Sequence, residues 1–134
     1  MDLKKNKQSL RFALLLAVFA GLGPFTIDTY LAAFPQMMSY FETTASMIQV
    51  SLTACMLGMS VGMLVMGSLS DIHGRRKPLI ISMVLYFLSS FACVFVPNIG
   101  VFIALWFIQG FSASAGIVIS RAIVSDMYSG VELT

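Results

Sequence analysis

Four long apolar segments divide the chain, and short polar stretches separate them. The segments cover about residues 12–34, 47–69, 79–96 and 99–124. A helix rises about 1.5 Å per residue, so about 20 apolar residues cross the roughly 30 Å hydrocarbon core of a bilayer. Open strands are excluded from lipid because every backbone polar group must be paired inside the protein. The pattern therefore predicts an all-α, polytopic membrane protein with four transmembrane helices.

The composition agrees with this prediction. The chain is 58% hydrophobic and 10% charged, with a mean hydropathy of +0.91, whereas soluble domains carry about 25% charged residues. His73 is the single histidine, so no serine–histidine–acid or metal-binding constellation supports an enzyme, a metal site or a cofactor. The cations are not interleaved with aromatic residues, so nucleic acid is not predicted as a partner.

The positions of the cations predict the orientation. Every lysine and arginine except Arg121 lies before residue 12 or in the link 70–78, and the links 35–46 and 97–100 contain none. The positive-inside rule then places residues 1–11 and the link 70–78 in the cytoplasm. Residues 12–126 form the membrane part of a multi-pass protein of the plasma membrane, and residues 127–134 begin the next cytoplasmic loop.

Small residues recur at a spacing that favours close contact between helices. Gly58 and Gly62 form a GxxxG pair, and Gly110 lies four residues before Ser114. Helices in lipid approach one another closely where small side chains line their contact. The sequence predicts tight packing that involves the second and fourth helices.

The stretch "GSLSDIHGRRKPL" (67–79) concentrates charge in a chain that carries little. Asp71 lies near the end of a predicted helix, where the helix dipole disfavours an acid. We therefore expect a partner for Asp71, either Arg75 four residues on or a group on another helix. Gly74 allows a tight turn with a positive φ.

This stretch resembles the signature loop between the second and third helices of major facilitator superfamily transporters. The departure is Ile72, where a cation is usual. The segments "FTIDTYLAAFPQM" (25–37) and "IQGFSASAGIVISRAIVSDMYS" (108–129) resemble the drug/proton antiporters of the bicyclomycin- and chloramphenicol-resistance type. The residues that match the loop are Gly67, Leu69, Ser70, Asp71, Gly74, Arg75 and Arg76.

The resemblance implies a fold of twelve helices in two six-helix halves that bind substrate between them. This chain would supply four helices of the N-terminal six-helix bundle, and the C-terminal half is missing. The loop would act as a cytoplasmic gate, in which Asp71 meets a helix of the other half and Arg75 pairs with Asp126. Its implied partners are the lipid bilayer, a small-molecule substrate, protons and the C-terminal half.

The fourth-helix motif of the family departs from its usual form here. The motif has an arginine three residues before Gln109-Gly110, and this chain has Trp106 in that place. Arg121 lies about four helical turns further along, so it cannot simply replace that arginine. The departure predicts that protons are coupled to substrate by a different scheme, or that coupling is impaired.

Asp28 is the candidate for proton coupling. Residues 12–27 give about 24 Å of helix, which is too short to cross the membrane, so the span continues through Asp28. An ionisable group within a membrane is costly and is a functional candidate by default. The alternative is a hydrated acid near the outer interface. Further side chains that could line a cavity are Tyr30, Gln36, Gln49, Met56, Met59, Met63 and Gln109.

The sequence therefore predicts a secondary transporter, with proton-coupled efflux of small drug-like compounds by alternating access as the first interpretation. A symporter or uniporter of a metabolite within the same superfamily is the main alternative. A small four-helix multidrug exporter that works as a dimer, and a four-helix membrane protein that transports nothing, are the others.

Overall fold

A computed structural model describes the backbone of residues 3–128 and the side chains of residues 10–126. It contains four helices: α1 Leu3–Tyr40, α2 Ala45–His73, α3 Arg76–Cys93 and α4 Ile99–Tyr128. All four are long and apolar enough to cross a membrane. The predicted all-α fold class is confirmed, and residues 129–134 of the predicted cytoplasmic loop lie outside the described part.

Helices α1 and α2 and the start of α3 extend beyond the apolar segments, so the first two links are shorter than the sequence predicted. Helix α3 ends earlier than predicted, at Cys93, and the link predicted at 97–100 covers 94–98. The link predicted at 35–46 is reduced to 41–44, and the link predicted at 70–78 to residues 74 and 75. The predicted bounds were wrong because a helix continues past its apolar stretch as long as its backbone groups remain paired. Pro78 lies in the first turn of α3, where proline is tolerated because that turn has no intrahelical partner for the N–H.

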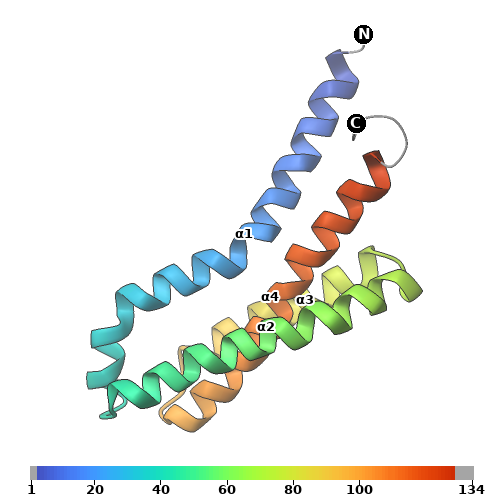
Figure 1. Ribbon diagram of the computed structural model, residues 1–134. Helices are drawn as coiled ribbons and strands as arrows, with labels where there is room; N and C mark the ends of the chain where they lie inside the picture. Colours follow the sequence, from blue (N-terminus) through green and yellow to red (C-terminus); the bar gives the residue numbers. More distant parts are fainter. Residues whose placement is uncertain (1–2, 129–134) are drawn as a thin grey trace.

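Helix α1 is bent and the others are straighter. It contains Pro24 and Pro35, and each removes a backbone hydrogen bond and clashes with the preceding turn. The ribbon changes direction twice along α1, so its two halves do not share one axis (Figure 1).

Helix α4 lies at the centre and packs against the other three helices. Its contact with α2 has almost no side-chain layer. A Cβ added to Gly58 would lie 2.1 Å from the carbonyl oxygen of Phe107, and one added to Gly110 would lie 2.1 Å from that of Cys55. The two backbones therefore touch, and the tight packing predicted from the small residues is confirmed.

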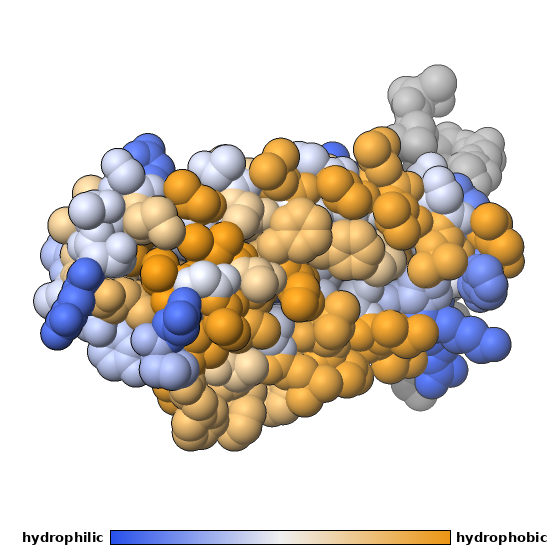
Figure 2. Space-filling view, turned by 90° about the horizontal axis from the view of Figure 1, so that it is seen from below, coloured by the Kyte–Doolittle hydropathy of each residue, from blue (hydrophilic) through white to orange (hydrophobic). Residues whose placement is uncertain are grey.

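The surface that is not packed against another helix is apolar over most of the length of the bundle. Large hydrophobic side chains such as Leu64, Phe87 and Phe91 are more than half exposed. Apolar residues cover the middle of the face shown in Figure 2, and hydrophilic residues gather at its two ends. This is the distribution that a membrane-spanning bundle requires, because lipid replaces water around the middle of each helix.

Candidate functional site

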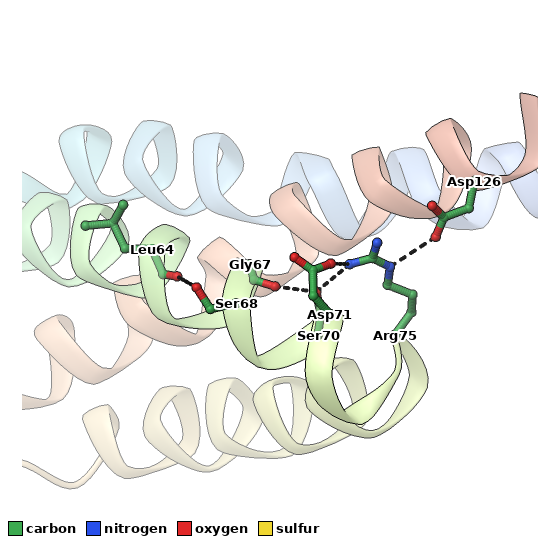
Figure 3. Close-up of polar contacts among 7 residues, drawn as sticks. All are labelled: Leu64, Gly67, Ser68, Ser70, Asp71, Arg75 and Asp126. Carbon is green, nitrogen blue, oxygen red and sulfur yellow. Dashed lines mark hydrogen bonds and ion pairs between the residues drawn. The ribbon is translucent and has the colours of Figure 1, made fainter. Parts of the chain in front are cut away.

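The short turn between α2 and α3 carries a compact cluster of charges, here called the turn cluster and made of Ser70, Asp71, Arg75 and Asp126. Gly74 has φ 81° and ψ 159°, a region that is essentially restricted to glycine. This conformation reverses the chain within two residues. It brings Arg75 back over the end of α2 and toward α4 (Figure 3).

Arg75 lies at the centre of the cluster. Its Nε donates a hydrogen bond of 3.1 Å to Oδ2 of Asp126, and its Nη1 donates one of 2.8 Å to Oγ of Ser70. Nη1 also forms an ion pair with the carboxylate of Asp71. The expected pairing of Arg75 with Asp126 is present. Of the two partners expected for Asp71, the one observed is Arg75, four residues on.

The cluster combines a charged bridge with partial access to solvent. The side chains are 28% exposed for Arg75, 64% for Asp71 and 59% for Asp126. The hydrogen bonds to Asp126 and Asp71 raise the pKa of Arg75 above its ordinary value, so the guanidinium stays charged. Because water reaches both carboxylates, the bridge can break at modest cost in free energy.

Ser70 is a member of the cluster that charge arguments alone did not single out. It is 1% exposed, and its hydroxyl donates a 2.9 Å hydrogen bond to the carbonyl oxygen of Gly67 while it accepts from Arg75. This fixes one branch of the guanidinium against the end of α2. In the sequence, the signal for Ser70 was its match to the small residue that precedes the acid in the signature loop.

The structure does not bring every predicted residue to this turn. A Cβ on Gly67 would meet only Val118, at an ordinary contact distance of 3.6 Å, so close packing does not account for that glycine. Arg76 is exposed at the first position of α3, and Arg121 is exposed on α4. Among the described side chains, neither forms a hydrogen bond or an ion pair with the turn cluster.

The three residues of the fourth-helix motif point to three different helices. The ring of Trp106 packs against that of Tyr30 on α1, with ring centroids 4.1 Å apart and an interplanar angle of 52°. Gln109 donates a 2.7 Å hydrogen bond from Nε2 to Oγ of Ser90 on α3, and Gly110 makes the backbone contact with α2 described above. The motif therefore joins α4 to the rest of the bundle, and Trp106 contributes an aromatic ring where the family pattern has a cation.

Tyr30 ties α1 to α2. It is 2% exposed, and its hydroxyl lies 2.6 Å from the carbonyl oxygen of Ile48 and 2.6 Å from Oγ of Ser51. Together with the ring contact with Trp106, these hydrogen bonds make Tyr30 the point where α1, α2 and α4 meet.

An open pocket of about 470 Å³ lies next to this junction. It is formed by α1, α3 and the first half of α4, at the end of the bundle opposite the turn cluster. Tyr30 and Gln109, two of the side chains predicted to line a cavity, line it, and so does Trp106. The wall also includes Phe25, Thr26, Thr29, Tyr86, Ser90, Cys93, Val94 and Phe102.

Asp28 lies apart from both the turn cluster and the pocket. It is exposed on α1, and it does not line the pocket, although Phe25 and Thr29 of the same helix do. At about 100° per residue, Asp28 lies on the side of α1 opposite the buried residues Gly23 and Tyr30, so it faces away from the other three helices. An acid in this position is available to water or to a further part of the protein.

Comparisons with known proteins agree with this arrangement. The family model of the Major Facilitator Superfamily matches residues 12–134. An uncharacterized MFS-type transporter, YdgK of Bacillus subtilis, is 49% identical over 96% of this chain and 32% of its own length. The bicyclomycin resistance protein homolog of Haemophilus influenzae is 29% identical over 98% of this chain and 33% of its own length.

A chloramphenicol resistance protein of Pseudomonas aeruginosa is 38% identical over 89% of this chain and 28% of its own length. The chain thus spans about a third of the length of the curated relatives that it matches. No solved structure matches it. With four membrane-spanning helices, the charged turn between the second and third, and a family match over nearly its whole length, the chain belongs to the Major Facilitator Superfamily.

Proposed function

We propose that this chain forms the first four helices of a proton-coupled transporter that exports small drug-like compounds by alternating access. The turn cluster is the observation that carries the proposal. Arg75 joins the end of α2 to the end of α4 through Asp71 and Asp126, so the bridge would hold the turn at the ends of these helices, where a second half could contact and release it in each cycle. The names of the chloramphenicol- and bicyclomycin-resistance relatives support drug-like compounds as the substrates.

The proposed gate needs a second half, which the longer relatives have room for. The exposed carboxylate of Asp71 would face a helix N-terminus of that half, where the positive end of the dipole favours an acid. Because the charges are partly solvated, the contact would be weak enough to open in each cycle. In this proposal the turn and residues 1–11 lie in the cytoplasm, residues 12–126 lie in the plasma membrane, and residues 127–134 begin the next cytoplasmic loop.

Asp28 is the proposed proton carrier. It is an acid within the span of α1, and its side chain points away from α2, α3 and α4. In an intact transporter this face of α1 would be turned toward the other half and the substrate. Protonation of Asp28 from one side of the membrane and release to the other would then couple proton flow to the movement of α1. Trp106 carries no charge, so Asp28 would act without an arginine at that position of α4.

The experiment uses the full-length transporter in sealed lipid vesicles with a pH-sensitive dye. We expect addition of chloramphenicol to cause proton release, and Asp28→Asn to abolish it while the protein still inserts and folds. Glu42→Gln is the matched control, because Glu42 is an exposed acid in the link between α1 and α2. Unchanged proton release in Asp28→Asn would remove Asp28 from the mechanism, and proton uptake together with substrate would indicate a symporter.

A further inference from the structure

A groove runs along the first part of α1, on a face that no other helix of the described part covers. Arg11, Leu14, Leu15 and Val18 line it, and its volume is about 360 Å³. The three apolar side chains are each between 57% and 62% exposed. Residues at these spacings lie on one face of a helix. The groove therefore starts at a cation and continues along an apolar strip.

The groove is open because this part of α1 turns its other side to the bundle. A Cβ added to Gly116 would lie 2.5 Å from the carbonyl oxygen of Phe19, so the backbones of α1 and α4 meet there. Within residues 10–18, Leu16 alone is buried. At about 100° per residue, Leu16 lies on the side of α1 opposite Arg11 and Val18. The strip is therefore left to contact lipid.

Arg11 has no acidic partner in the described part of the protein. Its side chain is exposed, and it forms no hydrogen bond or ion pair with any described side chain. The acids near the ends of α2 and α4, Asp71 and Asp126, are both engaged by Arg75. Within α1 the first acid is Asp28, which lies about 25 Å further along the helix. The guanidinium of Arg11 is therefore available to an anion from outside the chain.

The surroundings of Arg11 carry the same sign of charge. Lys4 and Lys7 precede it on α1 at a spacing that places all three residues on one helix face. Helix α4 extends to the same end of the molecule as the start of α1 (Figure 1) and contributes Arg121, which is exposed. Clusters of basic residues beside a membrane-spanning helix attract anionic lipids. Several cations together therefore favour an anion at this end of the groove.

We propose that this groove binds one anionic phospholipid, with the phosphate of its headgroup on Arg11 and an acyl chain along Leu14, Leu15 and Val18. The order of the residues fits this ligand. From Arg11 to Val18 the helix advances about 10 Å toward the middle of the membrane, as an acyl chain does from its phosphate. A guanidinium can also form two parallel hydrogen bonds with a phosphate. The lipid anchors the start of α1, a role that goes beyond the proposed function and does not depend on proton coupling.

The test measures lipid binding to the full-length transporter in detergent by native mass spectrometry. The probes are palmitoyl-oleoyl phosphatidylglycerol, which is anionic, and palmitoyl-oleoyl phosphatidylcholine, which has the same chains and no net charge. We expect the first phosphatidylglycerol to bind at least about fivefold more tightly than the first phosphatidylcholine. Equal affinity of the two lipids, or binding of neither, would overturn the proposal.

Removal of the charge at the start of the groove sharpens the test. We expect Arg11→Gln to weaken binding of phosphatidylglycerol about fivefold, which is the contribution of one cation at a membrane surface, and to leave phosphatidylcholine unchanged. The matched control is Arg76→Gln, because Arg76 is an exposed cation at the first position of α3, outside the groove. The control should bind phosphatidylglycerol as the unmodified protein does. An equal loss in the two variants would assign the effect to net charge and overturn the proposal.

The apolar part of the groove is tested without a change of charge. Val18 is 62% exposed, so Val18→Trp should fill the groove and leave the packing of the bundle intact. We expect it to weaken phosphatidylglycerol binding about threefold, because the acyl chain loses its contacts with the strip. Leu64→Trp is the control, since Leu64 is 77% exposed on α2, and it should have no effect. Unchanged binding in both Arg11→Gln and Val18→Trp would mean that another part of the longer protein covers the groove, and would overturn the proposal.

Discussion

The contact between α2 and α4 and the contact between α1 and α3 join helices in opposite ways. Glycines let the backbones of α2 and α4 touch, and Cβ atoms at Gly58 or Gly110 would lie 2.1 Å from a carbonyl oxygen. Helices α1 and α3 meet instead through long side chains, with the hydroxyl of Tyr86 on Thr26 and an open pocket beside it.

The difference separates a rigid part of the molecule from an adaptable one. Backbone-to-backbone contact leaves no rotamers that could absorb a displacement, so α2 and α4 behave as one unit. A contact made by side chains can be rearranged, and α1 is already bent at two prolines. The turn cluster lies at the end of the rigid pair, whereas the pocket belongs to the adaptable contact.

The largest expected effect comes from adding one methyl group to the rigid contact. We expect Gly110→Ala to destabilise the full-length transporter by about 3 kcal/mol, because overpacking of a tight core forces the helices apart. Gly21→Ala is the matched control, since nothing lies within 4 Å of a Cβ at that position. Thermal unfolding in detergent measures both, and equal melting temperatures would contradict the distinction between the two contacts.

A smaller loss of stability is expected where α1 meets α2 and α4, the rigid pair of helices. Tyr30→Phe keeps the ring contact with Trp106 but removes the hydroxyl that bonds to Ile48 and Ser51. Loss of a buried hydrogen bond of this kind costs about 1–2 kcal/mol. The same melting experiment measures it, and a melting temperature equal to that of the unmodified protein would mean that Tyr30 does not hold α1 in place.

The contact between α1 and α3 should lose less stability than the contact at Tyr30 when a tyrosine hydroxyl is removed. Tyr86→Phe removes the half-buried hydrogen bond to Thr26, and we expect a loss of about 1 kcal/mol or less. A loss of stability larger than that of Tyr30→Phe would reverse the assignment of rigid and adaptable contacts.

The smallest expected effect is the response of Arg75 to pH. Its pKa is raised by hydrogen bonds to Asp126 and Asp71, and a group with a raised pKa loses its stabilising contribution only as the pH rises through that value. From about pH 6 to pH 9 the guanidinium therefore stays protonated. The difference in melting temperature between the unmodified protein and Arg75→Gln should be constant over this range, and a difference that shrinks toward pH 9 would contradict the assignment.

The sequence predicted the features that depend on local rules. Four helices follow from hydropathy, the positive φ of Gly74 follows from its place between two charged helix ends, and the pairing of Arg75 with Asp126 follows from the resemblance. The ends of the helices were predicted less well, because a helix crossing the membrane has no hydropathic reason to stop where the apolar residues stop. The 35–46 and 70–78 links are the clearest examples.

The pocket and its hydrogen bonds could not be predicted in the same way. In lipid both the buried and the exposed faces of a helix are apolar, so hydropathy does not show which side of α1 faces α3. The pairing of Tyr86 with Thr26 depends on that rotation and on the bends at the two prolines. Tyr30 and Gln109 were singled out only as polar side chains within a span, which was enough to mark them as cavity candidates and too little to say where the cavity lies.

The central claim is that the turn cluster is a gate and does more than anchor the chain in the cytoplasm. The most direct test is the rate of chloramphenicol-driven proton release by a full-length variant in which residues 70–77 keep their composition but are rearranged, so that the positive charges remain on the same side. We predict unchanged insertion and orientation with loss of proton release, because Arg75 can no longer join Asp71 to Asp126. Proton release at the original rate would contradict the account and leave the turn with a topological role alone.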